Sequence, residues 1–94
     1  MSRQATLHAV IYGMVQGVNF RIFVLRHAQA MGLTGYVRNL SKERAVEVMA
    51  EGEREKLEQL LRQLEVGPRL ARVRRVDVNW SEYSGGYSQF RIGS

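Results

Sequence analysis

The chain has 94 residues, carries 14 Lys and Arg against 9 Asp and Glu for a formal net charge of +5, and contains no cysteine. These values exclude disulfides and thiolate metal sites, and the length allows a single hydrophobic core, so we expect one domain over residues 1–94. The positive charge favours anionic partners but does not choose between phosphorylated small molecules and nucleic acid. The N-terminus lacks a signal-peptide layout and the apolar segment from Leu7 is too short to cross a bilayer, so we expect a cytoplasmic protein without membrane contact.

In the first half of the chain, residues 1–5 are expected to form a loose leader and residues 6–12 a strand, because Leu7, Ala9 and Ile11 alternate with other residues. A helix should follow, since apolar residues recur there at steps of three and four. These apolar residues are Phe20, Phe23, Val24, Ala28 and Met31. Asn19 is placed as its N-cap and Gly32 as a left-handed C-terminal cap. Residues 34–40 predict a second strand.

The second half repeats this order without repeating the sequence. In residues 45–51, Val46, Val48 and Ala50 alternate with Glu47, Met49 and Glu51, which predicts a strand with one face in water. Gly52 is expected to end this strand. Residues 54–64 predict a helix with one leucine stripe. After the loop at Gly67 and Pro68, residues 73–80 return to strand spacing, and residues 89–92 allow a last short strand. The predicted fold class is α+β, a ferredoxin-like two-layer sandwich with an antiparallel sheet, two helices on one face and a short C-terminal strand.

The segment between the first strand and the first helix has the composition of an anion-binding loop. Gly13 and Gly17 let the backbone approach a ligand closely, and amides at a helix N-terminus carry a partial positive charge. Arg21, in the first turn, adds a planar fork of donors that matches phosphate or carboxylate oxygens. From these residues alone, the site is either a phosphate cradle or an ordinary strand-to-helix turn with a solvated arginine.

Two motifs in this chain resemble those of the acylphosphatase family. The first is Gly13-Met14-Val15-Gln16-Gly17-Val18-Asn19-Phe20-Arg21, and the second is Gly35-Tyr36-Val37-Arg38-Asn39. Residues 46–52, Gly67-Pro68 and residues 71–73 are also similar to family stretches, so the resemblance covers nearly the whole chain. One departure concerns the turn after Asn39: residues 40–45 lack the glycine-bearing turn that members usually have, and we expect a wider loop there.

The resemblance implies hydrolysis of the carboxyl-phosphate anhydride of acyl phosphates without metal or cofactor. It gives two catalytic residues: Arg21 would bind the phosphate and Asn39 would position the attacking water. The phosphate-binding positions, mainly through backbone amides, would be Gln16, Gly17, Val18, Asn19, Phe20 and Arg21. The implied partner is a small-molecule acyl phosphate, with phosphate or sulfate as competing anions and no nucleic acid, and we expect a monomer.

Two other classes share this topology. An RNA-binding module would present stacking aromatics on its central strands, where this chain has mainly aliphatic residues together with Glu47 and Glu51. A non-catalytic ligand-sensing domain would not explain why both motifs are present. His8 and His27 are read as surface or boundary histidines, and Tyr36 as a packing residue. A basic cluster before the last long strand is interpreted as a solvated sheet edge, with a weak anion or nucleic-acid patch as the alternative. Its members are Arg69, Arg72, Arg74 and Arg75.

Overall fold

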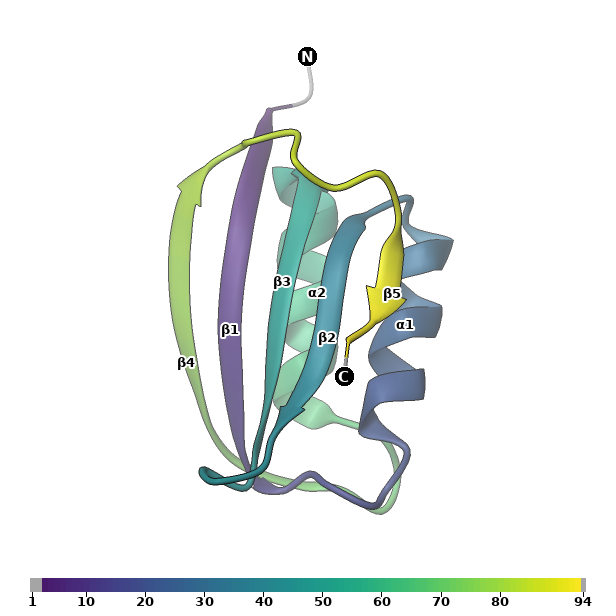
Figure 1. The fold of residues 1–94 in the computed structure, drawn as a ribbon, viewed down its shortest axis with the longest axis vertical. Helices are drawn as coiled ribbons and strands as arrows, with labels where there is room; N and C mark the ends of the chain where they lie inside the picture. The colour runs from purple at the N-terminus through teal and green to yellow at the C-terminus, as the bar shows by residue number, and fades with distance from the viewer. Residues whose placement is uncertain (1–2, 94) are drawn as a thin grey trace.

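A computed structural model describes residues 3–93 (Figure 1). The elements in chain order are β1 (Gln4–Met14), α1 (Phe20–Ala30), β2 (Thr34–Leu40), β3 (Ala45–Glu53), α2 (Arg54–Val66), β4 (Arg72–Glu82) and β5 (Phe90–Ile92). All the predicted elements are present, and most extend slightly beyond their predicted bounds. Of the predicted leader, Gln4 and Ala5 belong to β1, and residues 1 and 2 lie outside the described residues.

The five strands form one sheet in the order β4-β1-β3-β2-β5, and both helices cover the same face (Figure 1). The ferredoxin-like α+β prediction is therefore confirmed. The expectation of an antiparallel sheet holds for β1 to β4 but is wrong for β5, which pairs in parallel with β2. The reason is the path of the chain: after β4 it crosses one end of the sheet, so β5 enters at the opposite edge running in the direction of β2 (Figure 1).

The core lies between the sheet and the two helices. It is built by residues at alternate positions of β1 and β3 and by one stripe of each helix, as the apolar spacing predicts. These fully buried residues are Leu7, Ala9, Ile11, Val24, Ala28, Val46, Val48, Ala50, Leu57, Leu60 and Leu64. Each buried leucine contributes roughly 1.5–3 kcal/mol relative to an exposed one, so this layer holds both helices against the sheet.

The two ends of α1 differ in how well their caps were predicted. At the C-terminus Gly32 has φ +68°, the amide of Leu33 bonds the carbonyl of Ala28 and the amide of Gly32 bonds that of Gln29, so the left-handed cap is confirmed. At the N-terminus Asn19 occupies the cap position, but its side chain makes no capping hydrogen bond. Asn19 itself is left-handed, with φ 62°, rather than extended. The expected side-chain cap is therefore wrong, and the first amides of α1 stay free.

Two predictions for β3 are also wrong. Gly52 does not end the strand, which continues to Glu53, and Gly52 pairs with Ala5 of β1. A Cβ at Gly52 would lie 2.6 Å from Cδ2 of Leu33, so the missing side chain serves close packing rather than a break. Glu51, expected in water, is 1% exposed. The segment between β4 and β5 covers it and supplies hydrogen bonds from Ser84 and Gly85.

Within residues 3–93, no helix has the length and apolar character needed to cross a membrane.

Candidate active site

The loop at residues 15–19 joins β1 to α1 at the end of the sheet where the β2–β3 turn also lies (Figure 1). A bulge between Tyr12 and Gly13 shifts the register of β1 against β4 just before this loop. A Cβ at Gly13, whose φ is +134°, would lie 2.1 Å from the carbonyl oxygen of Arg72. Gly13 therefore allows β4 to approach β1 closely, whereas the sequence analysis expected it to allow the close approach of a ligand.

The loop leaves a run of backbone amides without partners. Gly17 at φ +74° and Asn19 at φ 62° are both left-handed, a conformation that is uncommon for a residue with a side chain. The first hydrogen bond of α1 runs from the amide of Phe23 to the carbonyl of Asn19, over 3.1 Å. Among residues 3–93, no carbonyl or side chain accepts from the amides of residues 16–22. Free N–H groups at a helix start attract anions.

A pocket of about 250 Å³ opens at this loop. Its lining is Val15, Gly17, Asn19, Arg21, Ile22, Asn39 and Ile92. The structure thus brings Arg21 and Asn39 together from separate elements, along with two of the predicted phosphate-binding positions. Gln16, Val18 and Phe20 are not among the residues that line the pocket, and the Phe20 side chain is 2% exposed in the core. An anion in the pocket would meet these three positions only through their backbone amides.

Arg21 and Asn39 reach the pocket from different elements, α1 and β2. Arg21 is exposed in the first turn of α1, and no carboxylate of residues 3–93 pairs with it. Asn39 lies opposite Val46 near the end of β2, two residues after the fully buried Val37, so the alternation of the strand turns its side chain to the helix-covered face. A free cation and a free carboxamide therefore share one cavity.

One residue that lines this pocket was not found from the sequence, and one predicted residue has a role that the sequence did not indicate. Ile92 forms part of the wall because β5 pairs with β2, placing Ile92 beside Val37. Gln16 acts through its side chain, whose Nε2 donates to the carbonyl oxygens of Leu40 at 3.2 Å and Ala45 at 3.0 Å. These bonds tie the loop to the β2–β3 hairpin. The motif contained Gln16, but nothing in the sequence indicated this pairing.

The turn after Asn39 is the wider loop that its composition predicted. Residues 41–44 connect β2 to β3, and Leu40 still pairs with Ala45. Arg44 takes the left-handed position, φ 51°, that glycine occupies more easily. The β2–β3 register continues without a shift through Asn39, so the unusual turn leaves the placement of Asn39 intact.

Comparison with known proteins agrees with this geometry. The family model described as Acylphosphatase matches residues 7–92. The chain belongs to the acylphosphatase family. It is 45% identical over 87 residues to an acylphosphatase from Caldanaerobacter subterraneus subsp. tengcongensis, covering 93% of this chain and 96% of the relative. It is 51% identical over 79 residues to one from Thermus thermophilus, covering 84% and 89%.

Solved structures of acylphosphatases are similar over the whole fold. An acylphosphatase from Coxiella burnetii superimposes with a TM-score of 0.90 at 37% identity, covering 97% of this chain and 94% of that chain. One from Bacillus subtilis gives 0.90 at 30% identity, covering 96% and 99%. The resemblance stated from the two motifs is therefore confirmed.

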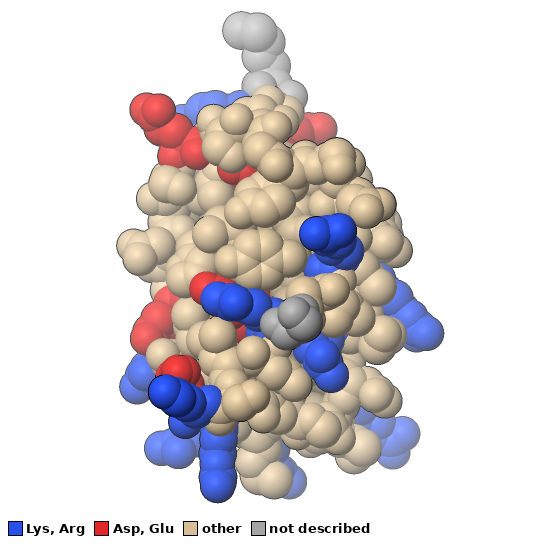
Figure 2. Space-filling model, viewed as in Figure 1, with Lys and Arg blue, Asp and Glu red and all other residues tan. Residues whose placement is uncertain are grey.

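Charge is unevenly distributed over this acylphosphatase. On the open face of the sheet, Figure 2 shows Lys and Arg gathered towards the end that carries the β1–α1 loop, with acidic side chains prominent at the opposite end.

The predicted basic edge is present, since Arg72, Arg74 and Arg75 are exposed on β4, an edge strand. Arg75 stacks over Tyr12 at 4.2 Å and pairs with Asp77 at 3.0 Å. The resulting field favours approach of anions to the pocket.

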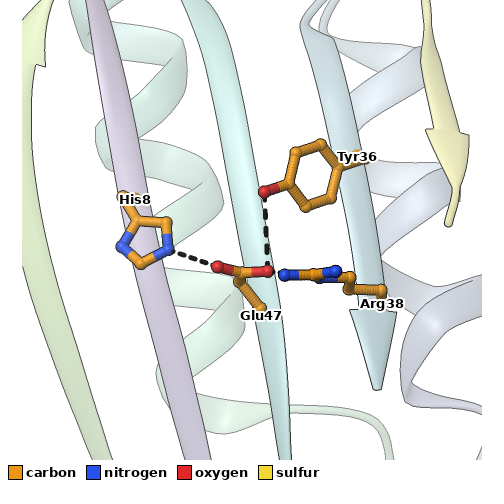
Figure 3. A network of polar contacts seen from close by, with 4 residues as sticks. All are labelled: His8, Tyr36, Arg38 and Glu47. Carbon is orange, nitrogen blue, oxygen red and sulfur yellow. Dashed lines mark hydrogen bonds and ion pairs between the residues drawn. The ribbon is translucent and has the colours of Figure 1, made fainter. Parts of the chain in front are cut away.

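A second polar cluster occupies the face of the sheet opposite the helices (Figure 3). Glu47 accepts from Arg38 and lies 2.7 Å from Nε2 of His8 and 3.5 Å from the Tyr36 hydroxyl. Burial alone would raise the pKa of Glu47, but the hydrogen bonds from His8 and Arg38 outweigh it and hold that pKa below its usual value. The boundary reading of His8 fits this position. Arg38 and Asn39 point to opposite faces, so this cluster stabilises the hairpin from outside the pocket.

No group of three or more His, Asp or Glu side chains arranged to hold a metal ion occurs among residues 3–93.

Proposed function

We propose that this acylphosphatase cleaves the carboxyl-phosphate anhydride of small-molecule acyl phosphates in the pocket between Arg21 and Asn39. Family membership carries the reaction class. The assignment of roles rests on one observation: Arg21, Asn39 and two loop residues with unpaired amides, Gly17 and Asn19, line the same 250 Å³ cavity. The two side chains and the two amides have no hydrogen-bond partner among the described residues.

Arg21 and the amides of residues 16–21 bind the phosphoryl group. A phosphoryl oxygen accepts readily from main-chain N–H groups, and the guanidinium adds two parallel donors with a full charge. Phosphoryl transfer passes through a loose transition state whose charge is spread over the equatorial oxygens. Donors fixed beforehand by the loop stabilise that charge without reorganising during the reaction.

Asn39 orients the attacking water. Its amide oxygen accepts a hydrogen bond from the water, and its amide nitrogen can donate to a phosphoryl oxygen. The water oxygen attacks phosphorus, the bond from phosphorus to the carboxyl oxygen breaks, and the carboxylate leaves with that electron pair. The water proton passes to a phosphate oxygen or to solvent. A strong base is unnecessary because the leaving carboxylate is already stable.

Several finer properties belong to the same proposal. Inorganic phosphate and sulfate present the same kind of oxygens as the phosphoryl group. They should therefore compete for the cradle, by which we mean the amides of residues 16–21 together with the Arg21 guanidinium. We further propose that the chain acts as a monomer in the cytoplasm; the absence of cysteine is compatible with a reducing compartment.

The experiment is to follow loss of acetyl phosphate with purified protein in the presence of a chelator, for the wild type and for Arg21→Ala. We expect turnover with chelator, competitive inhibition by phosphate, and a loss in kcat/KM of at least about a hundredfold in Arg21→Ala. Arg62→Ala, which removes an exposed arginine from α2, is the matched control and should behave as wild type. Equal activity in the wild type and Arg21→Ala would contradict the proposal.

A further inference from the structure

A second cavity adjoins the phosphate pocket. It measures about 610 Å³ and is lined by Asn19, Ile22, Phe23, Arg26, His27 and Pro68; we call it the acyl groove. Asn19 and Ile22 line both cavities. The five residues from the α1 region follow helical spacing of three and four, so the groove runs along one side of α1 away from the cradle. Pro68, from the loop between α2 and β4, forms its other wall.

The direction of the groove agrees with the geometry of the reaction. In phosphoryl transfer the attacking and leaving oxygens lie roughly in line across phosphorus. A water held by Asn39 on β2 therefore sends the leaving carboxylate away from β2. Asn39 lines the phosphate pocket but not the acyl groove, whereas Asn19 and Ile22 lie where the two cavities meet. The acyl group is thus directed along α1.

The lining of the groove indicates what kind of acyl group fits. Ile22 is 40% exposed, and the ring of Phe23 stands edge-on to that of His27 with centroids 4.5 Å apart. With Pro68 these side chains offer an apolar surface suited to a flat body. Arg26 is exposed, no carboxylate among residues 3–93 pairs with it, and the lining contains no acidic residue. Arg26 follows Arg21 by five residues, which is about 7.5 Å along a helix axis.

From this arrangement we propose that the acyl groove is the leaving-group subsite and that it selects acyl phosphates with a flat apolar body and a negative charge at its far end. The body lies against Ile22 and Phe23, and the distal charge meets Arg26. The inference rests on the proposed function, because it presumes that the phosphoryl group lies in the cradle. Phe23 and Arg26 are then specificity-determining residues rather than catalytic ones.

The test compares kcat/KM for acetyl, benzoyl and 4-carboxybenzoyl phosphate in the wild type, Phe23→Leu and Arg26→Gln. Expressing each result as a ratio between substrates, relative to wild type, removes differences in intrinsic reactivity. Phe23→Leu should lower the benzoyl-to-acetyl ratio about three- to tenfold, the scale of an aromatic contact. Arg26→Gln should lower the 4-carboxybenzoyl-to-benzoyl ratio about two- to fivefold at low salt, as for an exposed ion pair.

Arg62→Gln is the control for Arg26→Gln, since it removes an exposed helical arginine outside the groove, and it should leave both ratios unchanged. Thermal unfolding of each variant checks that Phe23→Leu is folded, and the surface variant Arg26→Gln tests the groove independently of core packing. If the wild type hydrolyses acetyl phosphate and neither variant changes its ratio, the groove does not hold the acyl group. If the wild type hydrolyses none of the three substrates, the proposed function itself fails.

Discussion

Gln16 donates a hydrogen bond from Nε2 to the carbonyl oxygen of Ala45, 3.0 Å away, across the gap between the β1–α1 loop and the β2–β3 hairpin. The same nitrogen donates to Leu40 at 3.2 Å. Gln16 thereby fixes the loop that carries the amides relative to the strand end that carries Asn39. The relative placement of the two halves of the pocket depends on these two bonds.

Gln16→Leu should therefore impair turnover more than its effect on stability suggests. Losing two hydrogen bonds costs about 1–3 kcal/mol of unfolding free energy. Misplacing the attacking water by a fraction of an ångström should lower kcat between about tenfold and a hundredfold. Gln29→Leu is the control, because Gln29 also donates to a backbone carbonyl, that of Phe90, but outside the pocket. Urea unfolding and steady-state kinetics measure both effects; an unchanged kcat in Gln16→Leu would contradict this role.

Gly17 and Gly32 allow the cradle to be tested with a matched pair. Both are left-handed, at φ +74° and +68°, and a Cβ at either would meet nothing within 4 Å. Alanine should therefore cost each about 1–2 kcal/mol of stability through backbone strain alone. Only Gly17→Ala should also weaken inhibition by phosphate, by about tenfold, since Gly17 lines the pocket. Equal phosphate inhibition constants in the two variants would show that the Gly17 backbone does not contact the anion.

Asn39→Ala should abolish most turnover while leaving anion binding largely intact. The variant misplaces water rather than phosphate, so kcat should fall about a hundredfold and the inhibition constant for phosphate should stay within about twofold. Asn39→Asp has nearly the same shape but adds a negative charge beside the anion, so it should weaken phosphate binding as well. If Asn39→Ala weakens phosphate binding and leaves kcat intact, its assigned role is wrong.

Glu51 should make the stability of the fold sensitive to acid. Burial would raise its pKa, but hydrogen bonds from Thr6, Ser84 and Gly85 outweigh it and hold the pKa below the ordinary value of 4.5. A folded-state pKa below the unfolded one gives stability that is present above the unfolded pKa and is lost as pH falls through the folded pKa. Wild-type stability should thus decline progressively from about pH 5 downwards.

The measurement is urea unfolding between pH 7 and pH 3 for the wild type and Glu51→Gln. The variant should lose about 1–3 kcal/mol at neutral pH, because a neutral amide replaces a carboxylate that accepts several hydrogen bonds. The difference between the two proteins should shrink on acidification. Glu65→Gln, at an exposed position of α2, should leave the profile unchanged. A constant difference between the wild type and Glu51→Gln across the pH range would contradict this assignment.

Local pattern was enough to predict the elements that carry the site. β2 was predicted with the bounds that the structure shows, Thr34–Leu40, and the start of α1 at Phe20 followed from the apolar spacing. Arg21 and Asn39 are 18 positions apart in the sequence, and the motifs nevertheless placed them at one site, where the structure shows them lining one pocket.

Two of the features that the sequence did not predict depend on contacts between distant segments. Glu51 follows the alternation of a solvent-facing position, but its partner Ser84 lies 33 residues away in the segment that crosses the sheet. Gly52 stays within β3 because Leu33 packs where its side chain would be. Asn19 is of a residue type that favours the N-cap position. Its backbone is left-handed, however, and its side chain accepts no hydrogen bond from the first amides of α1. At Glu51 and Gly52 tertiary packing overrides a local preference, whereas at Asn19 the backbone conformation itself removes the expected cap.

The central claim, that Arg21 and the loop amides hold the phosphoryl group while Asn39 faces it, is tested most directly by a crystal structure of the protein soaked in phosphate. We predict an anion in the pocket within hydrogen-bond distance of the Arg21 guanidinium and of amides between residues 16 and 21, with the Asn39 carboxamide turned towards it. A pocket without an anion beside Arg21 at saturating phosphate, or an Asn39 side chain directed away from the bound anion, would contradict the account.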